Sequence, residues 1–122
     1  MESNSPLLEK TLKFAARIVK LYNYLSQQKE TIIAKQIIRS GTSVGANAHE
    51  AAYASSRADF IAKMQISLKE TSETEYWLKL LVLSGFIDKE LGDSLIGNCV
   101  EIKRMLISSL NTAKDNKKYL RY

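Results

Sequence analysis

Apolar residues recur along this chain at the three- and four-residue steps of an α-helix, in four long stretches joined by short polar links. No stretch alternates apolar and polar residues as a half-buried strand does. Short links make successive helices run antiparallel, so the pattern predicts one all-α domain over 1–122, an antiparallel up-down-up-down left-handed four-helix bundle. The predicted helices are 6–26, 31–53, 56–84 and 88–113.

Residues near the ends of these stretches agree with this assignment. Ser5 can cap the first helix, and Pro6 suits its first turn. Ser55 or Ser56 can cap the third helix. Gly85 can supply the left-handed residue that commonly ends a helix, so the third helix is predicted to stop there.

The first predicted helix carries more apolar surface than one bundle core requires. Two neighbouring apolar stripes together cover about half of its circumference. We therefore expect this helix to contact a second subunit as well as the core. The first stripe is Leu8, Leu12, Ala15, Val19 and Tyr22, and the second is Leu7, Phe14, Ile18, Leu21 and Leu25.

Small residues follow one face of the second predicted helix. Glycine inside a helix costs about 1 kcal/mol relative to alanine, so we expect another backbone to approach closely there. Ser40 and Asn47 stand at core positions of the same helix and would need hydrogen-bond partners. The small residues are Gly41, Gly45, Ala48 and Ala52.

The third and fourth predicted helices each carry one core stripe. Tyr76 and Trp77 are adjacent and point about 100° apart, so we expect only one of them to enter the core. The third-helix stripe is Ile61, Met64, Leu68, Thr71, Glu75, Leu78 and Val82, and the fourth-helix stripe is Leu91, Leu95, Cys99, Ile102, Leu106 and Leu110.

Charge is unevenly distributed, although the net charge is only +5. Residues 1–48 carry +4, residues 49–102 carry −4 and residues 103–122 carry +5. If the two basic segments meet in space, they form a positive surface suited to nucleic acid. The alternative is a solvated helix face and a frayed basic tail over 114–122. The candidate nucleic-acid-binding residues are a basic row on the first helix, Lys10, Lys13, Arg17 and Lys20, and the tail residues Lys114, Lys117, Lys118 and Arg121.

The sequence contains no catalytic constellation, so we predict that the protein is not an enzyme and uses no cofactor. His49 is the only histidine, whereas di-metal four-helix bundles need a Glu-x-x-His pair on each of two helices. The run from Gly41 to Gly45 lacks the strand and the Lys-Ser/Thr pair of a phosphate-binding loop. A carboxylate metal site is the least favoured hypothesis, with a structural polar network as its alternative; the residues concerned are Asn47, Glu50, Glu70, Glu73 and Glu75.

Two further features concern the cellular compartment. Cys99 is the only cysteine, and its half-apolar helical setting predicts a buried, reduced thiol. No apolar run reaches the roughly 18 residues that a membrane span needs, and no secretory signal is visible. We therefore expect a cytoplasmic protein with no membrane partner.

The second and third predicted helices carry a distinctive set of motifs. Arg39-Ser-Gly-Thr-Ser-Val-Gly-Ala-Asn-x-x-Glu is followed by Ser56-Arg-Ala-Asp-Phe, Lys69-Glu and Glu73-x-x-Tyr-Trp-Leu. In these motifs the chain resembles the four-helix-bundle proteins related to open reading frames inside intervening sequences of bacterial 23S ribosomal RNA genes. The motif residues, which we interpret as structural, are Arg39, Ser40, Gly41, Gly45, Asn47, Glu50, Glu70, Glu73 and Trp77.

The resemblance implies a cytoplasmic bacterial protein that forms a ring-like homopentamer. Related bundles serve as accessory subunits of diversity-generating retroelements, where a basic pentameric surface engages reverse transcriptase and RNA. The first functional hypothesis is therefore a non-catalytic oligomer that binds RNA or a ribonucleoprotein. The second is a structural or protein-interaction ring without nucleic acid, and the third is a carboxylate metal protein.

Overall fold

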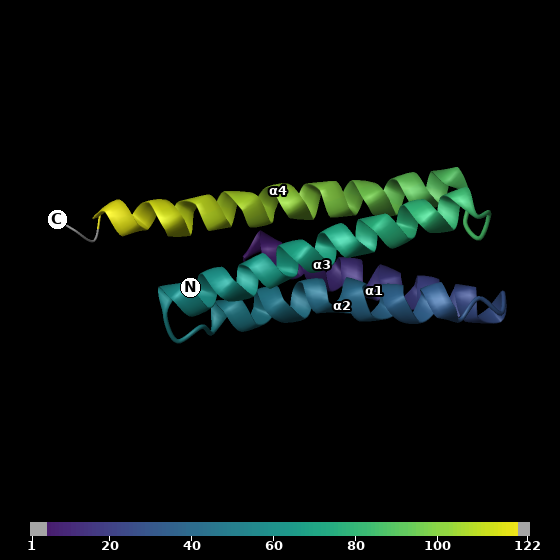
Figure 1. Ribbon diagram of the computed structural model, residues 1–122, viewed down its shortest axis with the longest axis horizontal. Coiled ribbons are helices and arrows are strands. Elements are labelled where there is room, and N and C mark those ends of the chain that lie inside the picture. Colours follow the sequence, from purple (N-terminus) through teal and green to yellow (C-terminus); the bar gives the residue numbers. More distant parts are fainter. Residues whose placement is uncertain (1–4, 120–122) are drawn as a thin grey trace.

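The computed structural model describes the backbone of residues 5–119 and the side chains of residues 5–115. Figure 1 shows successive helices running antiparallel. Each helix contacts the next in sequence, and α1 also contacts α4. These features confirm the all-α, up-down-up-down four-helix bundle. The helices are α1 (Pro6–Gln27), α2 (Ile32–Ala52), α3 (Arg57–Leu83) and α4 (Lys89–Tyr119).

The first three helices begin and end within one residue of their predicted bounds. Ser5 Oγ accepts a hydrogen bond from the Leu8 N–H at 3.3 Å, which caps α1. Ser56 Oγ accepts one from the Asp59 N–H at 3.0 Å, which caps α3. Gly85 follows α3 with a φ of 82°, the left-handed conformation that its position predicted.

Helix α4 is longer than predicted. The sequence pattern placed its end at residue 113 and a tail over 114–122, but the helix continues to Tyr119. The apolar stripe behind that prediction does end near Ala113, which is buried. Residues 114–119 contain neither glycine nor proline, and lysine is a favourable helix former, so local propensity favours a helical backbone beyond the end of the apolar stripe.

One stripe from each helix forms the core. On α1, the first predicted stripe lies largely outside it, with Leu12 71% and Val19 43% exposed. The apolar excess predicted for this helix is therefore present at the surface. The buried residues of α1 are those of the second predicted stripe together with Thr11: Leu7, Thr11, Phe14, Ile18, Leu21 and Leu25.

The core face of α3 is rotated from its predicted position. Ile61, Leu68, Glu75 and Val82 are only half-buried. Serine and threonine hydroxyls can bond carbonyls one turn earlier, as Thr71 Oγ1 does at 2.8 Å, and this lets them enter the core. The apolar pattern could not reveal such positions. The buried residues of α3 are Met64, Ser67, Thr71, Thr74, Leu78 and Leu81.

The close helix approach predicted from the small residues of α2 is made with α1 of the same chain. A Cβ atom added at Gly41 would lie 2.8 Å from Cγ2 of Ile18. One added at Gly45 would lie 3.2 Å from Oγ1 of Thr11 and 3.3 Å from its carbonyl oxygen. Larger side chains would push the two helices apart, so these glycines set the spacing between α1 and α2.

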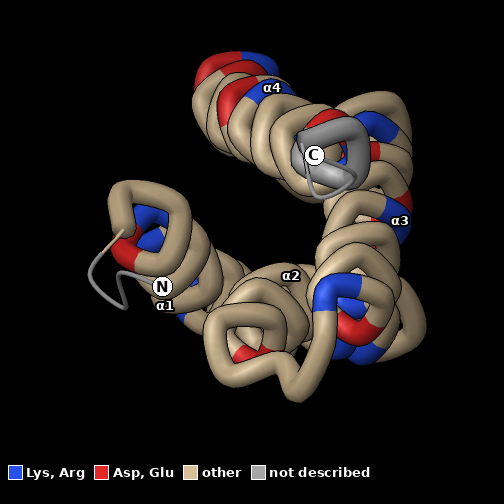
Figure 2. The backbone as a smooth tube through the Cα atoms, turned by 90° about the vertical axis from the view of Figure 1, so that its left-hand side faces the viewer, with Lys and Arg blue, Asp and Glu red and all other residues tan. Residues whose placement is uncertain are grey.

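The four helices form an arc when viewed along the bundle axis, with α1 and α4 at its two ends (Figure 2). Of the neighbouring pairs, α1 and α4 contact each other least. Across residues 5–119, no helix has an apolar stretch long enough to cross a membrane.

Candidate functional site

The basic row of α1 lies on the side of the helix that meets α4. Lys10 Nζ lies 2.9 Å from Glu101 Oε2. Arg17 Nη1 donates a hydrogen bond to Asn98 Oδ1 at 2.6 Å. Two of the four cations therefore have polar partners on α4, which the sequence did not indicate because the register between helices far apart in the chain was not known.

The other two cations of the row form no ion pair with α4 among the side chains that the structure describes. Lys13 Nζ is 3.4 Å from Glu9 Oε2, one turn earlier on the same helix. This pair is exposed, and such pairs stabilise a helix by only about 0.3–0.5 kcal/mol. Lys20 is exposed and belongs to no ion pair among the described side chains. Both ammonium groups can therefore be reached by an anion from solvent.

A notch of about 360 Å³ separates α1 from α4 next to this row. Three of the residues around it are cations and one is a carboxylate. The Asn98 side chain is the contribution of α4 to this lining. We call this the α1–α4 notch; its lining residues are Pro6, Glu9, Lys10, Lys13, Phe14, Arg17 and Asn98.

Of the four predicted tail residues, the structure describes the side chain of Lys114 alone. Lys114 is exposed, but it follows Glu101 by thirteen residues on α4 and so lies about 20 Å further along the helix axis. Lys117, Lys118 and Arg121 lie outside the residues whose side chains are described. A single positive patch formed by the row and the tail therefore stays a prediction, and the basic row is the part of it that the structure describes.

Four motif residues form a charged network at the outer edge between α2 and α3. Arg39 Nη1 lies 3.2 Å from Glu70 Oε1, and its Nη2 donates to Glu73. Trp77 Nε1 also donates to Glu73, at 3.0 Å. The hydrogen bonds from Trp77 and Arg39 lower the pKa of Glu73, so the carboxylate is charged at neutral pH. The network joins two helices, as a structural role requires.

The other polar motif residues are bonded within the chain. Ser40 is buried, and its Oγ accepts a hydrogen bond from Thr74 Oγ1 at 2.8 Å. Asn47 was predicted at a core position but is only half-buried, and its amide donates to a carbonyl one turn earlier in α2. Glu50 pairs with Lys63 at 3.0 Å. Each of these polar groups therefore has a partner on α2 or α3.

The carboxylates considered as metal ligands do not converge. Glu75 points to α4, where its Oε1 lies 2.7 Å from Lys103 Nζ. Burial raises the pKa of Glu75, but hydrogen bonds from Lys103 and Lys79 outweigh it, and the pKa is lowered. In the part of the chain that the structure describes, no group of three or more His, Cys, Asp or Glu side chains is placed to hold a metal ion.

Cys99 lies in the core on α4, as predicted. Burial, assisted by the charge of Glu75, raises the pKa of its thiol to about 12. The thiolate is the reactive form of cysteine, so this thiol is unreactive at neutral pH.

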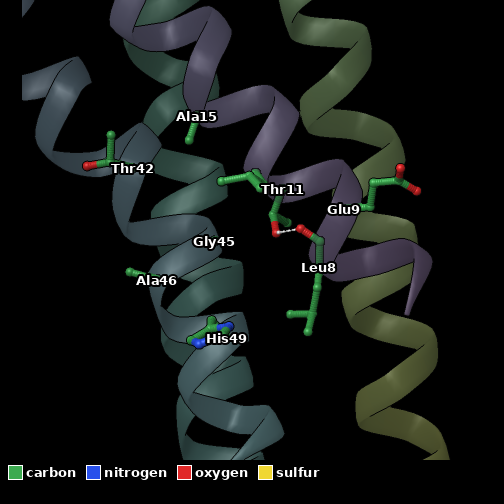
Figure 3. A pocket seen from close by; sticks show the side chains of 9 residues that line it. Leu8, Glu9, Thr11, Ala15, Thr42, Gly45, Ala46 and His49 are labelled. Carbon is green, nitrogen blue, oxygen red and sulfur yellow. Dashed lines mark hydrogen bonds between the residues drawn. The ribbon is translucent and has the colours of Figure 1, made fainter. Parts of the chain in front are cut away.

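A second hollow, of about 620 Å³, runs between α1 and α2 on the side of α1 away from the basic row (Figure 3). It joins two features that the sequence presented separately, the exposed apolar stripe of α1 and the small residues of α2. Thr42, Ala46 and His49 complete it and were not anticipated. We call this the α1–α2 groove; it is lined by Leu8, Glu9, Thr11, Leu12, Ala15, Thr42, Gly45, Ala46 and His49.

Comparison with known proteins places the chain in a family. A family model for the 23S rRNA-intervening sequence protein matches residues 4–108, so the last turns of α4 lie beyond the match. A crystal structure of a protein with unknown function from the S23 ribosomal protein family, from Bacteroides thetaiotaomicron VPI-5482, is 51% identical, with a TM-score of 0.84. The match covers 85% of this chain and 97% of that one. No curated protein matches. The chain belongs to the family of 23S rRNA-intervening sequence proteins.

Proposed function

We propose that this protein is a non-catalytic, oligomeric four-helix bundle that binds RNA through the basic row of α1. The observation that carries the proposal is that α1 presents apolar residues to the α1–α2 groove on one side and the basic row on the opposite side. A helix turns about 100° per residue, so Leu8 in the α1–α2 groove and Lys10 in the basic row lie about 200° apart around its axis. A second copy seated in the groove would leave the row uncovered.

The α1–α2 groove supports the oligomeric part of this proposal. Leu12 is 71% exposed beside it, and a grouped apolar surface of this kind commonly marks an interaction site. Ala46 is exposed and has a small side chain, so a helix from another copy could pack closely against α2 there. The resemblance described above implies a ring of five, so a homopentamer is the assembly we propose.

The basic row supports the RNA-binding part. Lysine and arginine contacts to phosphates provide most of the sequence-independent affinity of proteins for nucleic acid. Repetition of the row in five copies would strengthen a weak site through effective concentration. The names of the matching family and structure refer to 23S rRNA and to ribosomal protein, and RNA is the ligand class that those names favour.

A second candidate is a protein-interaction ring that binds no nucleic acid. Lys10 already pairs with Glu101 on α4, which reduces the positive charge available to an external anion. This candidate requires the α1–α2 groove but not the basic row. The two candidates therefore differ in the effect of removing the row.

Fluorescence anisotropy with a short single-stranded RNA would test the RNA-binding part. We expect the affinity of the wild type to fall steeply with salt, by about 0.7 logarithmic units per phosphate contact for each decade of salt. A variant with glutamine at all four row positions should lose about tenfold or more in affinity. A control with the same charge change at Lys29, Lys35, Lys69 and Lys89 should bind nearly as the wild type does. No RNA binding by the wild type at about 50 mM salt would refute the proposal.

Native mass spectrometry of protein from cells, before and after ribonuclease treatment, would test the assembly. Leu12→Gln should reduce the assembly to smaller species without unfolding the bundle, because Leu12 is mostly exposed. Leu83→Gln is the matched control, since Leu83 is 86% exposed at the end of α3, away from the groove. A monomeric wild type, or intact assembly of the Leu12 variant, would contradict an interface at the groove.

A further inference from the structure

The α1–α4 notch brings several hydrogen-bond donors around one space. Lys10, Lys13 and Arg17 extend from α1, and Asn98 lies opposite on α4. The notch measures about 360 Å³, ample for a phosphate group. Arginine has five N–H donors, and one of them is used by Asn98, a neutral partner that orients the guanidinium without neutralising it.

Two carboxylates pair with cations of the notch, Glu9 from its lining and Glu101 from outside the lining. Glu9 pairs with Lys13 at 3.4 Å, and Glu101 pairs with Lys10 at 2.9 Å. Counting these five charged side chains, the region has a net charge of +1, and removal of the Glu101 charge would make it +2. Removal of the Glu101 charge would therefore double the net positive charge that an incoming anion meets.

The Lys10–Glu101 pair is accessible to exchange. The side chains are 35% and 53% exposed, so water reaches both partners. Pairs at such sites add little stability, because solvent screens their attraction. A carboxylate and a phosphate also offer the same kind of anionic oxygen to an ammonium group.

We infer that the α1–α4 notch is a phosphate-binding site, and that the Glu101 carboxylate competes with the phosphate for Lys10. In the free protein, Glu101 holds Lys10 at the edge of the notch. A phosphate of bound RNA takes its place on Lys10 and also meets Arg17 and Lys13. The identification of the ligand as RNA rests on the proposed function. The new element is that Glu101, a residue of the same chain, competes with the ligand and so limits its affinity.

The Glu101→Gln variant tests the competition. Its matched control is Glu90→Gln, which makes the same charge change on the same helix, eleven residues earlier and so about 16 Å away along the axis. Binding is measured with a short single-stranded RNA and with inorganic tripolyphosphate, which shares the phosphate chemistry but is not a nucleic acid. Circular dichroism should show equal helix content in all variants.

We expect Glu101→Gln to bind both ligands about threefold to tenfold more tightly than the wild type, and Glu90→Gln to stay within about twofold. The salt slope for RNA should steepen by about 0.7, because Lys10 now releases a counterion. Adding Lys10→Gln to Glu101→Gln should abolish the gain, since Glu101 acts through Lys10.

The outcomes separate this inference from the proposed function. If tripolyphosphate shows the expected gain but RNA does not bind, the notch is a phosphate site and the RNA-binding function is wrong. If RNA binds the wild type but the Glu101 and Glu90 variants behave alike, the competition is wrong and the function stands. If the wild type binds neither ligand, or the gain survives removal of Lys10, the inference is overturned.

Discussion

Helices α2 and α3 meet through buried hydroxyl groups, whereas α1 and α4 meet through polar side chains near the surface. Ser40, Ser67, Thr71 and Thr74 are fully buried on α2 and α3, where they hydrogen-bond to one another and to backbone carbonyls. Within residues 5–115, the polar links between α1 and α4 are the Lys10–Glu101 pair and the Arg17–Asn98 hydrogen bond. Of the helix pairs that touch, this pair makes the least contact (Figure 2).

This difference indicates which part of the bundle can change partners. A buried hydroxyl that loses its hydrogen-bond partner destabilises the folded state by the full cost of desolvating that group. The α2–α3 contact therefore tolerates little alteration. An exposed ion pair contributes about 0–1 kcal/mol, so the α1–α4 contact can exchange a partner at small cost. The motif residues on which the resemblance was based lie on α2 and α3, and the basic row lies on α1.

The largest expected effect comes from filling the α2–α3 contact. Ser67 is fully buried, and its Oγ donates to the Val44 carbonyl at 2.7 Å. Ser67→Leu should lower the free energy of unfolding by about 2–3 kcal/mol, because the larger side chain has no space between the helices. Chemical denaturation followed by circular dichroism measures this. Ser72→Leu, at an exposed position on α3, should change it by less than about 0.5 kcal/mol, and equal effects at the two sites would contradict tight packing here.

The second largest expected effect comes from replacing a buried threonine by valine, which removes the hydroxyl group but keeps the shape of the side chain. Thr74 Oγ1 lies within hydrogen-bond distance, 2.8 Å, of both Ser40 Oγ and the Glu70 carbonyl oxygen. Thr74→Val should reduce the free energy of unfolding by about 1 kcal/mol, since Ser40 loses its partner. The control is Thr112→Val on exposed α4 surface. A neutral or stabilising Thr74→Val would show that the hydroxyl contact adds nothing to the packing.

A smaller effect depends on pH at the edge of the same contact. The folded-state pKa of Glu73 is lowered from 4.5 by hydrogen bonds from Trp77 and Arg39. A lowered pKa contributes stability above the unfolded-state value, and this is lost as pH falls through the folded-state pKa. The wild type should exceed Glu73→Gln in unfolding free energy by about 0.5 kcal/mol at neutral pH, because the site is about one-third exposed. Denaturation at pH values well below 4.5 should show the difference vanish, and a constant difference would exclude the linkage.

The smallest expected effect is at the α1–α4 contact. Glu101→Gln removes one surface ion pair and should change the free energy of unfolding by less than about 0.5 kcal/mol. The same denaturation assay applies, with Ser67→Leu as the sensitive reference. A loss of more than about 1.5 kcal/mol would mean that the α1–α4 contact is as demanding as the α2–α3 contact.

Much of the fold follows from local pattern. The bounds of α1, α2 and α3, the cap by Ser5 and the stop at Gly85 were all predicted, because helix periodicity and end signals depend on neighbouring residues. The end of α4 was missed because burial ended before helix propensity did. The rotation of the α3 core face was missed because Ser67 and Thr74 are polar residues. A pattern of apolar positions does not show that their hydroxyl groups are buried and hydrogen-bonded.

The candidate site was predicted less completely. The basic row was identified from spacing alone, yet the pairing of Lys10 with Glu101 joins residues about ninety positions apart. Similarly, the α1–α2 groove needs Leu12 and Gly45 to face the same space. Spacing along one helix gives no information on which side of another helix will lie opposite.

By itself, the sequence determined that four amphipathic helices form, where three of them end, which family the motifs resemble and which cations share one face of α1. The tertiary structure alone decided that two of these cations meet α4, that the glycines of α2 approach α1, and that the apolar excess of α1 becomes part of a groove. The physical reason is that helix formation depends on local interactions, whereas partners between helices are fixed by close packing of side chains distant in sequence.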